Sequence, residues 1–398
     1  MKKDTPKYVL GLGVLLGCFF TVSISTRAQT ATGVSDKEIL IGSCSALEGP
    51  SHFLGTETVS GAKAYFAMVN DAGGVDGRKL KLVAYDDSYD PAKTEACFNR
   101  LMEQKVFALG FFVGTPTAVK YIPMAESNKI PVVGLFTGAQ TLYVPLRHWI
   151  VNVRASYFDE TREQIEGMWG TLGYKKIGVI YPEDAFGAAV LDGVKAALKA
   201  HDAEPVAAAS YQRQTAQVGG AIDTVKAAKP EAVVLVGPAN TVAPILKQSH
   251  AKGWKPLFLT VSFVGTDDLI QEAGSDSDGM VITQVVPPYY LTDYKTVALY
   301  RRELTRYFPS AQPNFVSLEG FVDAMVLVEG LKRAGKELTR EGLIRGIESI
   351  HEFDMGLGPQ LKLNYSSKSH KGFDHVLPTV IRGGRAVPFT DWSTATPK

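Results

Sequence analysis

The side chains that could do chemistry stand mostly in short loops that directly follow apolar runs. Six such loops read SCSALEGPSHF, VGTPT, LFTGAQT, YPEDAFG, GPANT and SFVGTDD, and they carry glycine, hydroxyl side chains and aromatic rings with little positive charge. A phosphate site would require Lys or Arg, so this composition disfavours one. It favours a small ligand bound by backbone amides, hydroxyls and rings.

Each loop also has a simpler interpretation, which is the capping of a helix. Thr115 before Pro116 and Thr241 after Asn240 could serve that role alone. Six similar loops in one chain nevertheless favour a binding cleft, because ligands of open α/β sheets bind beyond the carboxyl ends of the strands.

The motifs of common enzymes are missing from the sequence. It contains no phosphate-binding Walker loop, His-Glu-x-x-His, Gly-x-Ser-x-Gly or pair of Cys-x-x-Cys motifs, and its 7 histidines are scattered. Asp86 and Asp87 form one adjacent carboxylate pair, which could serve a metal or acid–base chemistry, but capping of amides at a strand end is the favoured interpretation. We therefore predict no catalytic residue, no metal site and no cofactor.

Composition limits the classes of partner. The chain has 398 residues, 45% of them apolar, which is enough for two cores. Basic and acidic residues number 42 and 41, so no overall field would attract the protein to nucleic acid or an anionic membrane. A monomer that binds a small molecule is expected.

The first 28 residues have the features of a secretory signal peptide. Lys2, Lys3 and Lys7 precede an apolar run from Tyr8 to about Ile24, and residues 26–28, Thr-Arg-Ala, provide a cleavage site. The GLGVLLG stretch inside this segment follows no strand and is not a dinucleotide loop. No later run reaches the roughly 18 apolar residues of a membrane helix, so we expect a soluble periplasmic protein.

The three cysteines leave alternatives open. Cys18 follows LLG as in a lipoprotein signal, but the apolar Phe-Phe-Thr-Val after it makes lipidation the less favoured alternative. Cys44 and Cys97 could form a disulfide in an oxidising compartment. Because Cys97 lies on the apolar face of a predicted helix, the favoured interpretation is an unpaired, buried side chain.

From residue 38 onward, short β-branched runs alternate with helical patterns. About ten strands are expected, which is more than one comfortable sheet, and alternation with helices predicts parallel sheets covered on both faces. Asp90 and Pro91 are expected to begin one helix as N-cap and first residue. The pattern changes within residues 153–160, where we expect a lobe boundary, and two long helices and a β-rich tail follow Pro287-Pro288.

Several of these motifs together resemble one family. GVDGRKLKLVAYDDSYDP, GTPT, PVVGLFTGA and KKIGVIYPEDAFG are similar to the leucine/isoleucine/valine-binding proteins, the type I periplasmic receptors of ABC importers, and the resemblance spans about residues 38–389. It implies two α/β lobes joined by three crossing segments, with residues 31–153 and 287–374 in the N-lobe and 154–286 and 375–398 in the C-lobe. It also implies hinge closure on a ligand, and delivery to a membrane permease with its ATPases.

The resemblance also implies a ligand site between the lobes. Loops Val113-Gly114-Thr115 and Leu135-Phe136-Thr137 would bind the ligand carboxylate, with Gly114 standing where the family has a serine. Phe186, Pro238 and Ser262 would contact it from the other lobe. The family has tyrosine and glutamate at the last two positions, where they bind the ammonium group of an amino acid, and neither proline nor serine can supply that charge.

Two alternatives follow for the ligand. Glu48 or Glu319 could replace the missing carboxylate, or the ligand could lack an ammonium group and lie against rings. The complete predicted set is Ser45, Glu48, Phe53, Gly114, Thr115, Leu135, Phe136, Thr137, Tyr157, Phe186, Pro238, Asn240, Ser262, Phe263 and Glu319.

Two rival functions remain. A receptor of the same fold could pass its signal to a kinase or regulator instead of a permease. An exported enzyme could use Glu48, Asp184 or Glu319 as its carboxylates.

Overall fold

The protein is described by a computed structural model, which places residues 1–8 and 31–395. Most of the predicted signal segment, including Cys18, therefore lies outside the described residues. Within those residues, none of the helices has the length and apolar character required to span a bilayer.

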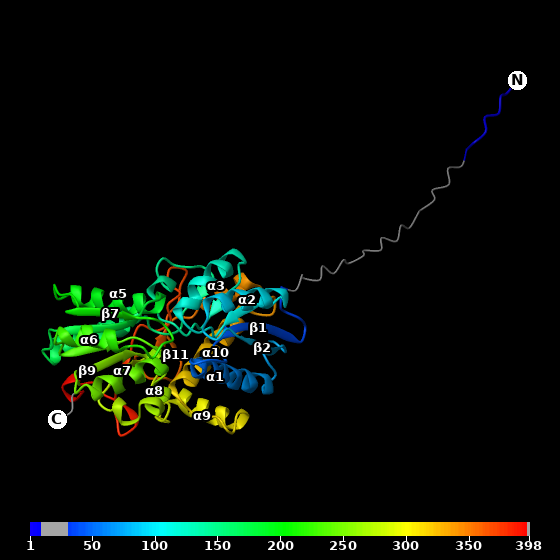
Figure 1. The fold of residues 1–398 in the computed structure, drawn as a ribbon. Helices are drawn as coiled ribbons and strands as arrows, with labels where there is room; N and C mark the ends of the chain where they lie inside the picture. Colours follow the sequence, from blue (N-terminus) through cyan, green and yellow to red (C-terminus); the bar gives the residue numbers. More distant parts are fainter. Residues whose placement is uncertain (9–30, 396–398) are drawn as a thin grey trace.

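The first part of the chain builds a five-stranded sheet. Its order is β2-β1-β3-β4-β5 and neighbouring strands run parallel. The strands are β1 (Glu38–Ser45), β2 (Lys79–Asp86), β3 (Ala108–Gly110), β4 (Val132–Val133) and β5 (Ile150–Val151). Helices α2 (Pro91–Glu103) and α3 (Thr115–Ser127) cover one face, and α1 (His52–Asp71) covers the other (Figure 1). We call this body the N-lobe.

A second body contains a seven-stranded sheet of order β14-β13-β10-β9-β8-β6-β7. Its parallel strands are β6 (Ile177–Pro182), β7 (Ala207–Tyr211), β8 (Ala232–Leu235), β9 (Leu257–Val261) and β10 (Val281–Gln284). Its helices are α4 (Tyr157–Glu166), continued by a π-helical turn (Gly167–Thr171), α5 (Ala185–Lys199), α6 (Gly219–Ala227), α7 (Ala239–Ala251) and α8 (Thr266–Ala273). We call it the C-lobe.

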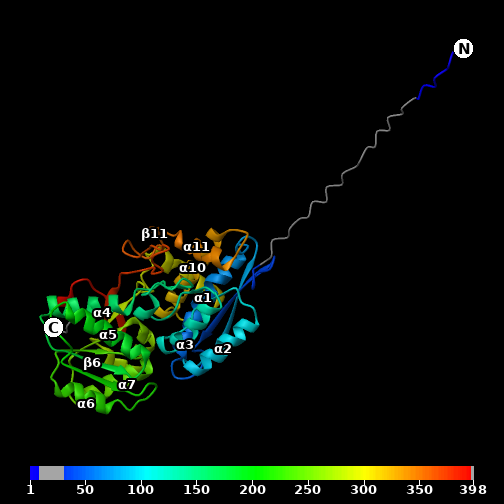
Figure 2. The same ribbon diagram turned by 90° about the horizontal axis from the view of Figure 1, so that it is seen from above.

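The last part of the chain contributes helices to the N-lobe and strands to the C-lobe. Helices α9 (Lys295–Tyr307), α10 (Phe315–Ala334) and α11 (Arg340–Glu348) return to the N-lobe, where α9 and α10 pack on α1. Strands β13 (Leu377–Arg382) and β14 (Arg385–Pro388) then add to the C-lobe sheet, with β13 antiparallel to β10. A small hairpin of β11 (Phe353–Asp354) and β12 (Lys362–Leu363) lies between α11 and β13 in the sequence. The predicted α/β fold of two mostly parallel sheets is confirmed, and the two bodies lie side by side in Figures 1 and 2.

Residues 152–156 are one of the segments that connect the bodies. The backbone of Asn152 pairs with Lys371, and the N–H of Phe373 donates to the carbonyl of Val153 at 2.8 Å. Two crossing segments therefore run alongside each other.

Close helix packing in the N-lobe depends on glycine. A Cβ on Gly61 of α1 would lie 1.9 Å from the carbonyl oxygen of Ser317 on α10, and one on Gly320 would lie 2.1 Å from the carbonyl of Thr58. The two backbones therefore approach more closely than any larger residue would allow. This contact holds α10, which carries Glu319, against α1.

Two features differ from the sequence expectations. Helix α11 was not predicted, because its glycines weaken helix propensity; one of them, Gly346, is needed since a Cβ there would lie 2.4 Å from the Gly330 carbonyl. The interpretation of Cys97 as unpaired is wrong, because packing of α2 on β1 brings it to Cys44 in a disulfide with a Cα–Cα distance of 6.0 Å.

Candidate functional site

Loops at the carboxyl ends of strands from both sheets meet at one interface. The ring of Phe263, which follows β9 of the C-lobe, lies 5.6 Å from the ring of Phe136, which follows β4 of the N-lobe. Phe263 also lies 4.5 Å from Phe186 and 5.8 Å from Tyr89. Phe186 in turn lies 5.3 Å from Tyr157. Four predicted rings therefore come together, and Tyr89 joins them although the sequence analysis did not select it.

The two predicted threonine loops lie next to each other on the N-lobe side. The hydroxyls of Thr115 and Thr137 are 2.7 Å apart, and both residues are buried. Gly114 precedes helix α3 with a positive φ of 93°, and a Cβ there would overlap the ring of Tyr89. Thr115 is not a cap, because the N-cap position of α3 is Gly114, which has no side chain. The start of α3 thus has no side-chain acceptor for its first N–H groups, as in sites that bind anions.

A buried arginine that the sequence analysis did not select lies in the first crossing segment. Arg154 is 2% exposed, and its guanidinium lies 5.2 Å from the ring of Phe136 and 5.7 Å from that of Tyr157. Its Nη2 donates to Glu160 Oε1 at 3.1 Å and to the hydroxyl of Ser262. Its Nη1 lies 3.2 Å from Glu319 Oε1, but the two atoms make no hydrogen bond.

The carboxylate of Glu160 is fully engaged. Besides Arg154, its oxygens accept hydrogen bonds from the backbone N–H of Ser262 at 2.7 Å, from the Ser262 hydroxyl at 3.0 Å and from the Thr283 hydroxyl at 2.8 Å. Burial raises the pKa of Glu160, and the positive charge of Arg154 opposes that rise. The hydroxyl and N–H of Ser262 are therefore already used in hydrogen bonds with Arg154 and Glu160.

Two further buried carboxyl groups stand one helical turn apart on α10. Burial raises the pKa of Glu319 to about 7, with Arg154 lowering it and Glu160 raising it. The pKa of Asp323 is raised well above its ordinary value by burial and by Glu319. Near neutral pH this pair therefore holds at least one proton, which reduces the negative charge around Arg154.

The interface contains several buried polar atoms that have no hydrogen-bond partner among the described residues. They are Tyr89 Oη, Arg154 Nε and Nη1, Tyr157 Oη and Glu319 Oε1, and Ser45 Oγ at the end of β1 is a further one. Buried polar groups in folded proteins are nearly always paired. Such a concentration at one interface indicates where a polar ligand would bind.

The remaining predicted residues occupy different places. Glu48 is exposed, and its backbone N–H donates to Asp86, so the structure does not bring its side chain to Arg154. Phe53 is half-buried near Gly265 of the C-lobe. Pro238 lines a cavity of about 10 Å³ together with Phe186, and the partly buried Asn240 follows it in α7. Leu135 is buried beside Phe136.

An ion-paired arginine joins the lobes at the edge of this interface. Arg213, after β7 of the C-lobe, donates from Nη2 to the backbone carbonyl of Tyr89 in the N-lobe at 2.7 Å. Its guanidinium lies 4.6 Å from the Tyr89 ring, and its Nε donates to Asp184 of its own lobe at 3.1 Å. The two lobes are therefore in direct contact at this edge of the interface.

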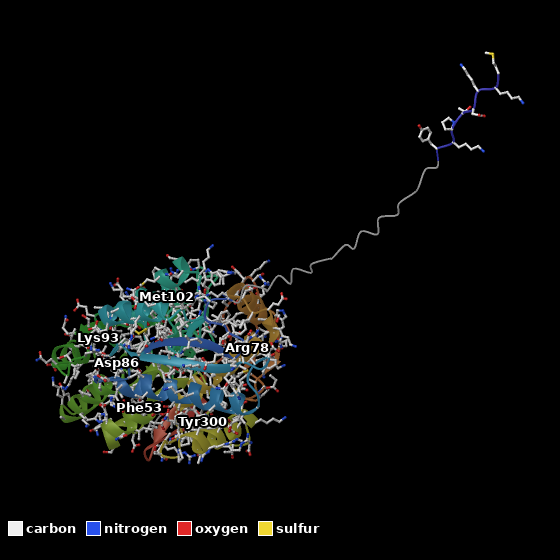
Figure 3. The ribbon with its side chains drawn as sticks, turned by 90° about the vertical axis from the view of Figure 1, so that its right-hand side faces the viewer. Phe53, Arg78, Asp86, Lys93, Met102 and Tyr300 are labelled. Atoms are coloured by element: carbon white, nitrogen blue, oxygen red, sulfur yellow. A yellow bond between two sulfur atoms is a disulfide. The ribbon has the colours of Figure 1, made fainter. Side chains whose placement is uncertain are left out.

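Three carboxylates that could have served chemistry, namely Asp86, Asp87 and Asp184, instead accept hydrogen bonds from nearby backbone N–H groups. Asp86, at one end of β2 with Arg78 at the other in Figure 3, accepts from the N–H groups of Leu47 and Glu48, each at 2.9 Å. Asp87 accepts from Tyr89 N–H at 2.9 Å and from a threonine hydroxyl, and Asp184 caps α5. The capping interpretation of Asp86 and Asp87 is confirmed. No cluster of potential metal ligands occurs among residues 1–8 and 31–395.

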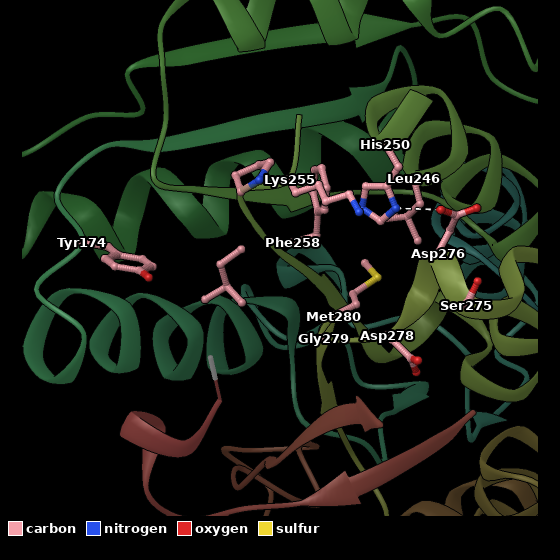
Figure 4. Close-up of a pocket in the computed structure, with 12 residues that line it drawn as sticks. Tyr174, Leu246, His250, Lys255, Phe258, Ser275, Asp276, Asp278, Gly279 and Met280 are labelled. Carbon is pink, nitrogen blue, oxygen red and sulfur yellow. Dashed lines mark hydrogen bonds and ion pairs between the residues drawn. The ribbon is translucent and has the colours of Figure 1, made fainter. Parts of the chain in front are cut away.

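A cavity of about 580 Å³ lies elsewhere in the described part of the chain, at the amino ends of β9 and β10 (Figure 4). Two of its polar side chains pair with each other, since His250 Nδ1 lies 2.7 Å from Asp276 Oδ1. None of its lining residues contributes an unpartnered buried polar atom. The interlobe interface is therefore the better candidate site.

Comparisons with known proteins agree on one family. A family model described as periplasmic binding protein matches residues 38–375. An amino acid binding protein of Pseudomonas aeruginosa is 25% identical over 267 residues, which cover 65% of this chain and 70% of that protein.

Solved structures share the fold over nearly their whole length. A possible leucine/isoleucine/valine-binding protein from Rhodopirellula baltica has a TM-score of 0.85 and 32% identity, and the match covers 91% of this chain and 99% of that one. A fatty acid ABC transporter substrate-binding protein from Thermomonospora curvata has a TM-score of 0.83 and 22% identity, with coverage of 92% and 94%.

Proposed function

Since the chain belongs to the periplasmic binding protein family, whose members bind solutes for ABC transporters and are not enzymes, we propose that it captures a small carboxylic acid between its lobes. The ligand is an amino acid or a related acid. Binding stabilises the closed form, which a membrane permease and its ATPases then recognise.

The observation that carries this proposal is the group of unpartnered buried polar atoms between the lobes. The hydroxyls of Tyr89 and Tyr157 and the Nε of Arg154 are buried and have no hydrogen-bond partner among the described residues. The Thr115–Thr137 pair and the start of α3 stand on the N-lobe side of the same interface. Together they suit a ligand with a carboxylate head and an apolar or aromatic body against the rings.

The relatives support a carboxylic acid without deciding which one. The Pseudomonas aeruginosa relative is named for amino acids, and the Thermomonospora curvata structure is named for fatty acids. The shared group of these two ligand classes is the carboxylate. We propose that the threonine pair binds that group here.

Export fits the same function. A receptor of this family meets its solute outside the cytoplasmic membrane, and the predicted signal at residues 1–28 would take the chain to the periplasm. The disulfide between Cys44 and Cys97 suits an oxidising compartment.

Native mass spectrometry of the purified protein, followed by calorimetric titration with the retained ligand, tests the proposal. Thr137→Val should weaken binding at least about tenfold, because it removes one hydrogen bond to a charged group. Thr224→Val is the matched control, since Thr224 is exposed and its hydroxyl donates to the Gly220 carbonyl of its own helix at 2.9 Å. Equal affinities of the two variants, or scattering profiles that never contract with any acid, would contradict the proposed function.

A further inference from the structure

One arginine supplies the charge next to the proposed carboxylate site. Its position limits which second polar group a ligand can have beside its carboxylate. Arg154 lies between the N-lobe ring of Phe136 and two C-lobe groups, the ring of Tyr157 and the hydroxyl of Ser262. Its Nε has no hydrogen-bond partner among the described residues, and its Nη1 has only the ion pair with Glu319 at 3.2 Å. The interface thus presents N–H donors where a polar ligand would lie.

The carboxylates around Arg154 offer little to an ammonium group. Glu160 already accepts four hydrogen bonds, from Arg154, from the N–H and hydroxyl of Ser262, and from Thr283. Glu319 is the other carboxyl group in contact with Arg154, at 3.2 Å. An ammonium that approached Glu319 would stand beside the guanidinium, and two positive charges in a water-poor interface repel each other strongly.

A hydroxyl or keto oxygen of the ligand beside the Arg154 guanidinium would, in contrast, be bound. It could accept a hydrogen bond from Arg154 Nε or Nη1, and it would add no positive charge to the interface. Resting on the function proposed above, we infer that the ligand is a carboxylic acid with a hydroxyl or keto oxygen, and no ammonium group, beside its carboxylate. Arg154 donates to that oxygen and so determines the specificity of the site.

Proton linkage distinguishes this ligand class from amino acids. Glu319 titrates at about pH 7. The charged and titratable groups that face it are Arg154 from the crossing segment, Glu160 from α4, Asp323 from its own helix, and Tyr143. A partly negative oxygen beside Glu319 raises its pKa, so binding takes up a proton and affinity falls as pH rises from 6 to 8. An ammonium lowers that pKa, so affinity would rise over the same range.

The experiment compares three acids that differ at one position, namely leucine and its 2-hydroxy and 2-oxo analogues, and the corresponding phenylalanine series. Each is titrated calorimetrically at pH 6, 7 and 8, in two buffers of different ionisation enthalpy so that proton uptake is measured directly. We expect at least one hydroxy or oxo acid to bind at least tenfold more tightly than its amino counterpart. Its affinity should fall with pH, by at most about tenfold per unit.

Glu319→Gln gives the second measurement, because it removes the titrating carboxyl group and keeps a side chain of nearly the same size. The hydroxy or oxo acid should bind this variant as well as it binds the original protein at pH 6, and the decline toward pH 8 should disappear. Glu329→Gln, on the same helix but paired with Arg333 at 2.7 Å, should keep the decline.

Tighter binding of the amino acid, affinity that rises with pH, or loss of binding in Glu319→Gln would each overturn the inference. Binding by no member of either series would overturn it too. These results leave the proposed function standing, because that function is tested separately by the retained ligand, the Thr137→Val variant and the contraction of the lobes in scattering.

Discussion

Arg213 should control how tightly the protein holds its ligand although it lies at the edge of the interface. Its hydrogen bond to the Tyr89 carbonyl and its contact with the Tyr89 ring join the two lobes. Its ion pair with Asp184 lies within the C-lobe and persists when the lobes separate. Arg213→Gln therefore removes a contact that only the closed form has.

The magnitude follows from the geometry. A hydrogen bond from a charged donor contributes about 1.5–3 kcal/mol, and a cation–π contact contributes roughly 0.5–1 kcal/mol at exposed sites. The Arg213 side chain is 23% exposed and Gln retains some polarity, so about 1–2 kcal/mol is a reasonable loss. In a free protein that is mostly open, this loss corresponds to a fall in affinity of about 5- to 30-fold.

Calorimetric titration with the retained ligand measures the affinity, and stopped-flow displacement should place most of the change in the dissociation rate. Arg333→Gln is a matched control, because Arg333 pairs with Glu329, donates to the Ser349 carbonyl and contacts the Phe353 ring entirely within the N-lobe. It should leave affinity unchanged. The reasoning is refuted if both variants bind equally well, or if Arg213→Gln shows the original affinity together with a normal contraction in scattering.

Two predictions concern stability. Replacing Cys44 and Cys97 by serine should lower the unfolding free energy by about 4 kcal/mol, from the loop entropy of a separation of 53 residues, and urea unfolding that shows a loss below about 1 kcal/mol would contradict this. Burial raises the pKa of Asp87 from 3.8 to about 6, so its contribution to stability is complete below pH 4 and is lost as pH rises through about 6. Asp87→Asn should flatten the decline of unfolding free energy between pH 4 and 6.5 in urea titrations, and a decline as steep as in the original protein would refute that assignment.

Local sequence pattern was sufficient for most of the elements. Alternating apolar runs and helical spacing predicted the parallel strands, and Asp90 caps α2 as expected, with its carboxylate accepting from the N–H of Ala92 at 2.8 Å. The pattern failed for α11, where glycine serves packing against α10 and lowers helix propensity. It also failed for the cysteine pair, because a spacing of 53 residues says nothing about proximity.

Part of the candidate site could also be predicted from the sequence. Thr115 and Thr137 follow strands directly, and the carboxyl ends of neighbouring parallel strands meet at one edge, so their proximity was predictable. The rings after β4, β6 and β9 were predictable for the same reason.

The sequence by itself thus determined the two-sheet architecture and the positions of the loops that we propose bind the carboxylate, because both depend on periodicity and on the direction of the strands. Only the tertiary structure decided the charge of the site. Arg154 meets Glu160 from 6 residues away and Ser262 from 108 residues away, and Glu319 reaches them from a helix near the end of the chain. The pKa of a buried carboxyl group depends on its burial and on the charges around it, and for Glu319 those neighbours come together only in the folded chain.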